Sequence, residues 1–198
     1  RYPGYLLGEG LSLLVLTSSA DDKLRFRNWG RHYNEGLDKK NQGLYREAFR
    51  SYQSAIEVAP IEVCKAWALN NFAYDLVSCP DAELRDAHLA TSYSHEACEL
   101  TRWQYWVFLG TLARCYSSVG QYEQAERVAQ AYLKNAPPEE VVLGGEPPVN
   151  REEMDHKLQR FRLRRPWEDL PIAVDIPPPG AGTPGGSTGQ GNSPTLAP

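Results

Sequence analysis

The side chains best suited to metal binding in the middle of the chain are His88, His95 and Glu99. The two histidines are seven residues apart, which places them two turns apart on one face of a helix. Side chains at that separation start roughly 10 Å apart, whereas zinc ligands converge to about 2.0–2.2 Å from one ion. We therefore expect a hydrated helix surface here and predict no metal site.

Motifs of the common catalytic classes do not point to an enzyme. The chain contains neither the Gly-x-x-x-x-Gly-Lys loop that binds phosphates nor the His-Glu-x-x-His motif of zinc proteases. No carboxylate pair or Ser–His set stands out as an acid–base or nucleophilic centre. The sequence therefore favours a protein that is not an enzyme, and it predicts no cofactor.

Charge and hydropathy argue against two further classes of function. The 198 residues carry 21 basic and 25 acidic side chains, a net charge of −4, so a globally basic nucleic-acid binder is disfavoured. No run of apolar residues reaches the ~18 that a membrane-spanning helix needs. Hydrophobic residues make up 41% of the chain, which is enough to build a core.

The four cysteines form no Cys-x-x-Cys pair, so neither a zinc ribbon nor a disulfide scaffold is expected. Cys79 should lie at the opposite end of a helical hairpin from Cys98, which leaves Cys64 and Cys98 as the only pair that geometry allows. We favour buried free thiols instead. Free thiols favour a reducing compartment such as the cytoplasm.

Residues 21 to about 137 have an almost entirely helical pattern. Prolines occur there only at Pro60, Pro80 and Pro137, each where a helix should end. Residues 19–22, Ser-Ala-Asp-Asp, have the pattern of a capping box that opens the first helix. No segment shows a sustained alternation typical of strands. The predicted fold class is all-α.

Residues 1–20 are an apolar segment with two interpretations. Because the chain begins with Arg1, we expect it to be part of a longer polypeptide. The apolar stretch 5–17 is followed by small residues at 18–20, as in a signal peptide, but Glu9 interrupts it. We favour a connecting segment that packs on the first helix; the signal-like interpretation would imply an exported or membrane-attached protein.

The segment 171–198 has the composition of a disordered tail. It holds seven prolines, six glycines and a single acidic residue, Asp175. Such a chain buries too little apolar surface to offset its backbone entropy. The Pro177–Pro179 run could act as a polyproline ligand, but we favour a linker.

An internal repeat relates the first and third parts of the helical region. Gly43 and Tyr45 recur 77 residues later as Gly120 and Tyr122, and the same offset joins further residues of both segments. Small residues would let two antiparallel helices approach closely, aromatic residues would fill the space beside them, and a proline would end the second helix. The aligned pairs are Gly36/Ala113, Gly43/Gly120, Tyr45/Tyr122, Ala48/Ala125, Tyr52/Ala129, Ala55/Tyr132 and Pro60/Pro137.

This spacing resembles the ~34-residue tetratricopeptide repeat. The resemblance covers about residues 29–139 and implies a solenoid of three helical hairpins at 29–62, 66–103 and 106–139. The second copy, recognised by Asn70-Asn71-Phe72-Ala73-Tyr74, has a loop at 77–86 that is longer than usual. It is similar to a variant repeat found in bacterial members of the family. Three repeats are about the minimum for a stable stack.

A polar helix at 150–165 is expected to close the stack. The apolar residues Met154, Leu158, Phe161 and Leu163 fall near helical spacing, with charged residues between them.

The resemblance also implies a ligand-binding groove lined by the first helix of each hairpin. Aromatic, amide and arginine side chains there would suit an extended or helical peptide. The alternative is that Trp67 and Tyr74 simply pack between repeats. The residues at the family's groove-facing positions are Tyr33, Leu37, Lys40 and Asn41 in the first hairpin, Trp67, Asn70 and Tyr74 in the second, and Val107, Arg114, Ser117 and Ser118 in the third.

The family's best-defined ligand mode grips a peptide C-terminal carboxylate with basic and asparagine side chains. Only Asn71 matches that pattern, because Leu37 replaces an expected Asn and Thr111 an expected basic residue. We do not expect this chain to bind a peptide in that way.

A basic cluster near the end of the last predicted helix is a second candidate surface. It could contact RNA or an anionic membrane. Cations in a last helical turn also complement the helix dipole without any partner, and we favour that interpretation. The cluster comprises Lys157, Arg160, Arg162, Arg164 and Arg165, beside Phe161 and Trp167.

The sequence thus predicts a protein–protein interaction module, a scaffold that holds a peptide or protein segment in a concave groove. An alternative is an accessory docking region of a larger enzyme or envelope assembly. Nucleic acid is a disfavoured partner, and membrane contact would involve only residues 1–20 or the basic helix.

Overall fold

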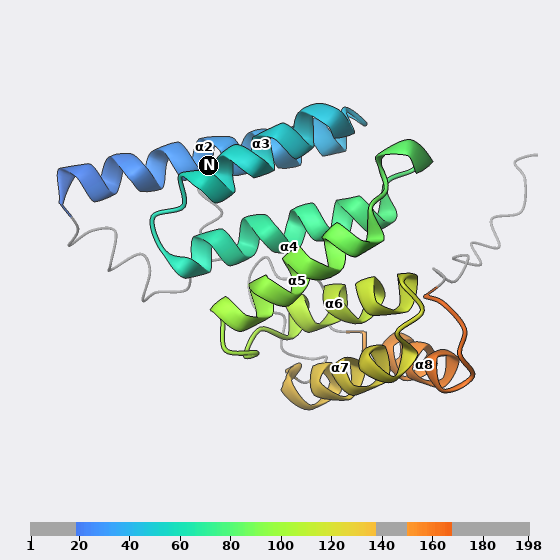
Figure 1. Ribbon diagram of the computed structural model, residues 1–198. Coiled ribbons are helices and arrows are strands. Elements are labelled where there is room, and N and C mark those ends of the chain that lie inside the picture. Colours follow the sequence, from blue (N-terminus) through green and yellow to red (C-terminus); the bar gives the residue numbers. More distant parts are fainter. Residues whose placement is uncertain (1–18, 138–149, 168–198) are drawn as a thin grey trace, which may run out of the picture. The chain divides into compact units, whose positions relative to one another are not determined.

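The computed structural model describes residues 19–137 and 150–167, all within one compact unit that ends at Trp167. These residues form seven α-helices and one short 3-10 helix, with no strand among them (Figure 1). The prediction of an all-α fold is confirmed. The expectations for residues 1–18 and 171–198 lie outside the described residues.

Six of the helices form three consecutive hairpins (Figure 1). Within each hairpin the two helices pack on each other, and each hairpin packs on the next; α4 also contacts α6 directly. The first helix starts well before residue 29 and α4 starts before residue 66, the positions expected from the sequence for the first two hairpins. The three hairpins are α2 (Ala20–Asn41) with α3 (Tyr45–Glu57), α4 (Glu62–Ser78) with α5 (Ala87–Leu100), and α6 (Trp106–Ser118) with α7 (Tyr122–Asn135).

Helix ends follow the signals in the sequence. The Oγ of Ser19 accepts a hydrogen bond from the Asp22 amide at 3.1 Å, and the Asp22 carboxylate accepts one from the Ser19 amide at 3.3 Å. This is the predicted capping box. Helices α3, α4 and α7 end two or three residues before Pro60, Pro80 and Pro137, as expected.

Two glycines form the tight turns of the first and third hairpins. Gly43 and Gly120 have φ angles of +76° and +75°, a left-handed conformation that favours glycine. The second hairpin lacks such a glycine and uses a longer loop, which contains the 3-10 helix η1 (Ala82–Leu84). Asp86 ends this loop by accepting a hydrogen bond from the Leu89 amide at 2.9 Å, which caps α5.

All four cysteines are buried and free, so no disulfide joins Cys64 to Cys98. Burial raises the pKa of the Cys64, Cys98 and Cys115 thiols to about 12. They act as small apolar core residues.

The last helix, α8 (Arg151–Arg162), packs against α7. Its Met154, Leu158 and Phe161 side chains are buried as predicted, but Leu163 is 66% exposed. The prediction for Leu163 was wrong because this residue comes two positions after the buried Phe161, about 200° further around the helix, and so faces solvent. Arg151 donates to the carbonyls of Leu133 and Ala136 and so caps the last turn of α7.

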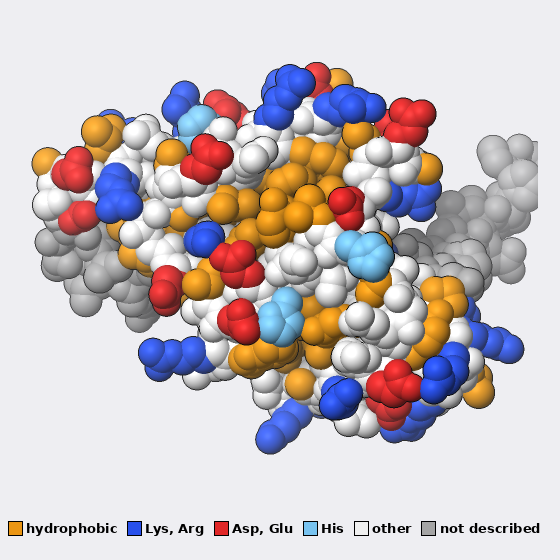
Figure 2. Space-filling model, viewed as in Figure 1, with side chains coloured by type: hydrophobic (Ala, Val, Ile, Leu, Met, Phe, Trp, Pro, Cys, Tyr) orange, Lys and Arg blue, Asp and Glu red, His pale blue; other side chains and the backbone are white. Residues whose placement is uncertain are grey.

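Acidic and basic side chains are interspersed over the face shown in Figure 2, around a hydrophobic area near its centre. That face carries no field of one sign, as expected from the near balance of charges. No helix of the described residues is long and apolar enough to cross a membrane.

The tight packing of Gly36 of α2 against Tyr52 of α3 leads to a stability prediction. A Cβ atom at Gly36 would lie 2.4 Å from Cε1 of the buried Tyr52. Tyr52 is fully buried and bonded through its hydroxyl, so its ring cannot move aside. We expect Gly36→Ala to lower the free energy of unfolding by about 1–3 kcal/mol, measured by urea denaturation followed by circular dichroism.

Gly110→Ala is the matched control, since its Cβ would lie 3.4 Å from the Tyr132 ring, an ordinary contact. This change should be neutral, or stabilising by up to ~1 kcal/mol from helix propensity. Equal effects of the two substitutions would show that close packing at Gly36 is not what limits the first hairpin.

Candidate binding site

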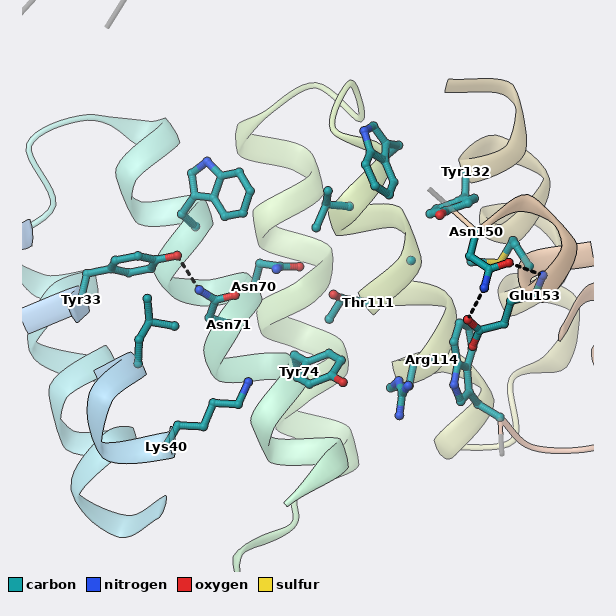
Figure 3. Close-up of a pocket in the computed structure, with 17 residues that line it drawn as sticks. Tyr33, Lys40, Asn70, Asn71, Tyr74, Thr111, Arg114, Tyr132, Asn150 and Glu153 are labelled. Carbon is teal, nitrogen blue, oxygen red and sulfur yellow. Dashed lines mark hydrogen bonds between the residues drawn. The ribbon is translucent and has the colours of Figure 1, made fainter. Parts of the chain in front are cut away.

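A pocket of about 480 Å³ lies along the first helices of the three hairpins. Figure 3 shows side chains from α2, α4 and α6 facing it, and it is bounded at one end by residues of α7, α8 and the segment after α8. Of the residues predicted to form a groove, those that line the pocket are Tyr33, Leu37, Lys40, Trp67, Asn70, Tyr74, Val107 and Arg114.

Three predicted groove residues do not line this pocket. Asn41 is the exposed last residue of α2, and Ser118 is exposed at the end of α6. Ser117 is 1% exposed and has an internal role: its Oγ donates to the carbonyl of Arg114 at 2.9 Å and accepts from the amide of Trp167 at 3.1 Å. It therefore attaches the segment after α8 to α6.

The far wall of the pocket was not predicted from the sequence. Trp106 and Gly110 lie on the same helix face as the predicted Val107 and Arg114, and helical spacing could have identified them. The contributions from α7, α8 and the following segment depend on tertiary packing and had no signal in the repeat pattern. The lining residues absent from the predicted groove are Asn71, Trp106, Gly110, Thr111, Tyr132, Asn150, Glu153, Met154 and Trp167.

A buried carboxylate joins α2, α3 and α4 beside the pocket. Asp75 is 1% exposed; its Oδ1 lies 3.1 Å from Nζ of Lys40, and its Oδ2 accepts a hydrogen bond from the Tyr52 hydroxyl at 3.2 Å. Burial raises the pKa of Asp75, although Lys40 and Tyr52 oppose that shift. Burial, and then the Asp75 carboxylate, raise the pKa of Tyr52.

Cations and aromatic rings alternate across one side of the pocket. Lys40 and Arg114 flank the ring of Tyr74, at 5.0 and 5.1 Å from its centroid. Arg114 also lies 4.8 Å from the Trp167 ring, which Lys157 approaches at 4.9 Å. Contacts of this kind contribute ~0.5–1 kcal/mol at exposed sites and more where water is excluded. This row of cation–ring contacts connects α2, α4, α6 and α8.

The basic cluster is largely engaged within the protein. Lys157 is fully buried, while Arg162 and Arg164 form ion pairs with Glu126 and Glu123 of α7 at 2.9 and 2.7 Å. The Arg162 and Arg164 pairs connect the end of α8 to α7, whereas Lys157 contacts Glu153 of α8 and the Trp167 ring. This arrangement favours a structural role over the RNA or membrane surface considered from the sequence.

Adjacent asparagines of α4 face different neighbours. The Asn71 amide donates to the Tyr33 hydroxyl at 2.5 Å, so it serves to join α2 and α4. Asn70 points the other way, toward Thr111 of α6 (Figure 3). The single asparagine that matched the carboxylate-gripping pattern is thus occupied within the fold.

Two residues that line the pocket each have a buried polar atom without a hydrogen-bond partner among the described residues, Trp67 at Nε1 and Asn70 at Oδ1. Their side chains are only 3% and 2% exposed. Leaving a buried donor or acceptor unpaired costs ~1–3 kcal/mol. Trp67 also packs edge-on against Phe108 at 4.7 Å, so it both fills the space between α4 and α6 and lines the pocket.

The described residues contain no group of three or more side chains placed to hold a metal ion. His95 lies 3.6 Å from the Glu99 carboxylate and against the Trp103 ring at 5.3 Å. His88 is exposed.

The buried position of Asp75 generates a pH-dependent prediction. Its raised pKa means that the folded state holds the proton more tightly than the unfolded chain, in which Asp titrates near ~3.9. The carboxyl therefore favours folding most below that pH, and this contribution is lost as the pH rises through the folded-state pKa. We expect Asp75→Asn to become progressively more stable relative to the wild type as the pH rises from about 3.5 to 7.

Urea unfolding of both proteins at several pH values measures this difference. A wild type that instead gains stability over the variant across that range would show that Lys40 and Tyr52 outweigh burial.

Comparison with known proteins does not supply a function. The chain matches no protein-family model, no curated protein and no solved structure.

Proposed function

We propose that this protein is an interaction module in which three tetratricopeptide-like repeats bind a peptide or protein segment along their first helices. The main observation behind the proposal is the pocket. Residues from three successive hairpins line one cavity of about 480 Å³, and eight of them were predicted from the repeat pattern. A cavity of this size fits the usual range of ligand sites, ~300–1,000 Å³. The cavity would accommodate a few side chains of a bound segment.

Local packing supports the repeat assignment. The glycines at the first and third turns have the same left-handed conformation. In the first hairpin, Gly36 of α2 lies against the ring of Tyr52, and Ala48 and Ala55 of α3 are fully buried. This use of small residues where two helices approach is what the repeat pattern predicts.

The lining of the pocket supports a peptide ligand. The rings of Trp67, Tyr74 and Trp106 offer apolar area, which dominates the energy of most protein interfaces. The side chains of Asn70 and Thr111 add hydrogen-bonding groups among them. For one short groove, a dissociation constant of about 1–100 μM corresponds to ~−8 to −5.5 kcal/mol.

A variant that fills the pocket tests the proposal. Val107 lines the pocket and is half-buried, so Val107→Trp places a large side chain in the space that the ligand would occupy. We would select peptides from a displayed library of random twelve-residue sequences on the wild type. We expect Val107→Trp to bind the selected peptides at least tenfold more weakly, measured by fluorescence anisotropy.

Gln130→Trp is the matched control, because Gln130 is exposed on α7 and does not line the pocket. It should bind like the wild type, and circular dichroism should show that both variants fold. Failure to select any peptide on the wild type, or equal binding by Val107→Trp, would overturn the proposal.

A further inference from the structure

The pocket is open to a ligand around Tyr74 of α4. This side chain is 37% exposed, more than any other ring that lines the pocket, whereas Trp67, Trp106 and Tyr132 are buried. A segment that enters the pocket can therefore reach the surroundings of Tyr74 without displacing core side chains.

Two cations lie beside this exposed ring, each from a different helix. Nζ of Lys40 and Cζ of Arg114 are 5.0 and 5.1 Å from the Tyr74 centroid, and Figure 3 shows the ring between them. The two charges are thus at most about 10 Å apart, roughly one Debye length in 0.1 M salt. The edge of an aromatic ring is also the positive end of its quadrupole. An anionic group beside the ring is therefore attracted by all three side chains.

The fold holds both cations in position. Lys40 contacts Oδ1 of Asp75 at 3.1 Å, which accounts for one of the three N–H donors of an ammonium group. Arg114 also lies over the Trp167 ring, at 4.8 Å. A guanidinium group can contact a ring and pair with a carboxylate through two N–H donors. Side chains that are positioned in advance lose little conformational freedom when they bind an acid.

Two carboxylates at or beside the pocket have partners of their own. Asp75 is buried and does not line the pocket. Glu153 lines it, but one of its oxygens accepts a hydrogen bond from the Asn150 amide at 3.2 Å and the other lies 3.9 Å from Nζ of Lys157. A basic side chain near Tyr74 would be repelled by two cations, whereas an acidic one would be attracted by both.

We infer that Lys40, Tyr74 and Arg114 form a subsite for an acidic side chain, Asp or Glu, of the bound segment. The carboxylate accepts hydrogen bonds from Arg114, and Lys40 adds electrostatic attraction. The inference rests on the proposed function. It adds a chemical requirement to that function, because aromatic area alone would accept segments of either charge.

Replacing the acidic residues of a selected peptide by amides tests the subsite. The probe is the tightest twelve-residue peptide selected on the wild type, with each Asp changed to Asn and each Glu to Gln in turn. We expect one such change to weaken binding to the wild type about fivefold, the upper range for a partly exposed ion pair, and binding to Arg114→Gln by less than about twofold. Fluorescence anisotropy measures both effects.

Arg127→Gln is the matched control, because Arg127 is exposed on α7 and does not line the pocket. It should keep the full sensitivity to the amide change.

Lys40 is tested together with Asp75, so that no unpaired carboxylate stays buried. The double variant Lys40→Gln/Asp75→Asn removes both charges and should lose part of the sensitivity. Asp75→Asn alone keeps the cation and should keep the sensitivity or increase it. If circular dichroism shows that Arg114→Gln does not fold, this pair of variants decides.

Three results would overturn the inference. One is a peptide excluded by Val107→Trp in which no amide change depends on Arg114 or Lys40; the proposed function would then stand alone. Another is a peptide that loses binding when its C-terminal carboxylate is amidated but not when its acidic side chains are changed. The third is an equal loss of sensitivity in Arg127→Gln, which would indicate a general effect of charge. If no peptide binds the wild type at all, the proposed function itself fails.

Discussion

The carboxylate of Asp75 lies where α2, α3 and α4 meet, and it fixes how the first hairpin sits on the second. A charge buried this deeply is unfavourable unless it is paired. Lys40 and Tyr52 supply the pairing from α2 and α3. Because each partner comes from a different helix, the contacts hold only in one register. That register brings Tyr33, Leu37 and Lys40 to the pocket.

Lys40 also takes part in a row of cation–ring contacts that runs along the pocket. The lysine that pairs with Asp75 also flanks the half-exposed ring of Tyr74, and Arg114 of α6 flanks the other side. Arg114 in turn contacts Trp167, which lies beyond the end of α8. An ion pair and cation–ring contacts thus connect α2, α4, α6 and the segment after α8 along the pocket, which core residues such as Trp67 and Met154 also line.

Much of the fold was predictable because its signals are local. Prolines, the capping box at Ser19 and the turn glycines mark helix ends within a few residues of sequence, and the helices end accordingly. Most of the pocket residues on α2, α4 and α6, the first helices of the three hairpins, were predictable from the repeat. Trp167 and Tyr132 were not, since their place in the pocket depends on how α8 and its neighbours pack. The exposure of Leu163 could have been predicted from the sequence, because a residue two positions after Phe161 lies on the opposite side of a helix.

Asn70 and Asn71 show why a stripe of residues does not by itself define a binding site. Two identical side chains follow each other on α4, and a helix turns by about 100° between them. Asn71 therefore meets Tyr33 of α2 and becomes part of the fold, whereas Asn70 faces α6, where its oxygen finds no partner among the described residues. The same side chain thus has a hydrogen-bond partner at one position and a buried oxygen without a partner among the described residues at the next. The difference lies in which neighbour each side chain meets, which only the packing of three hairpins decides.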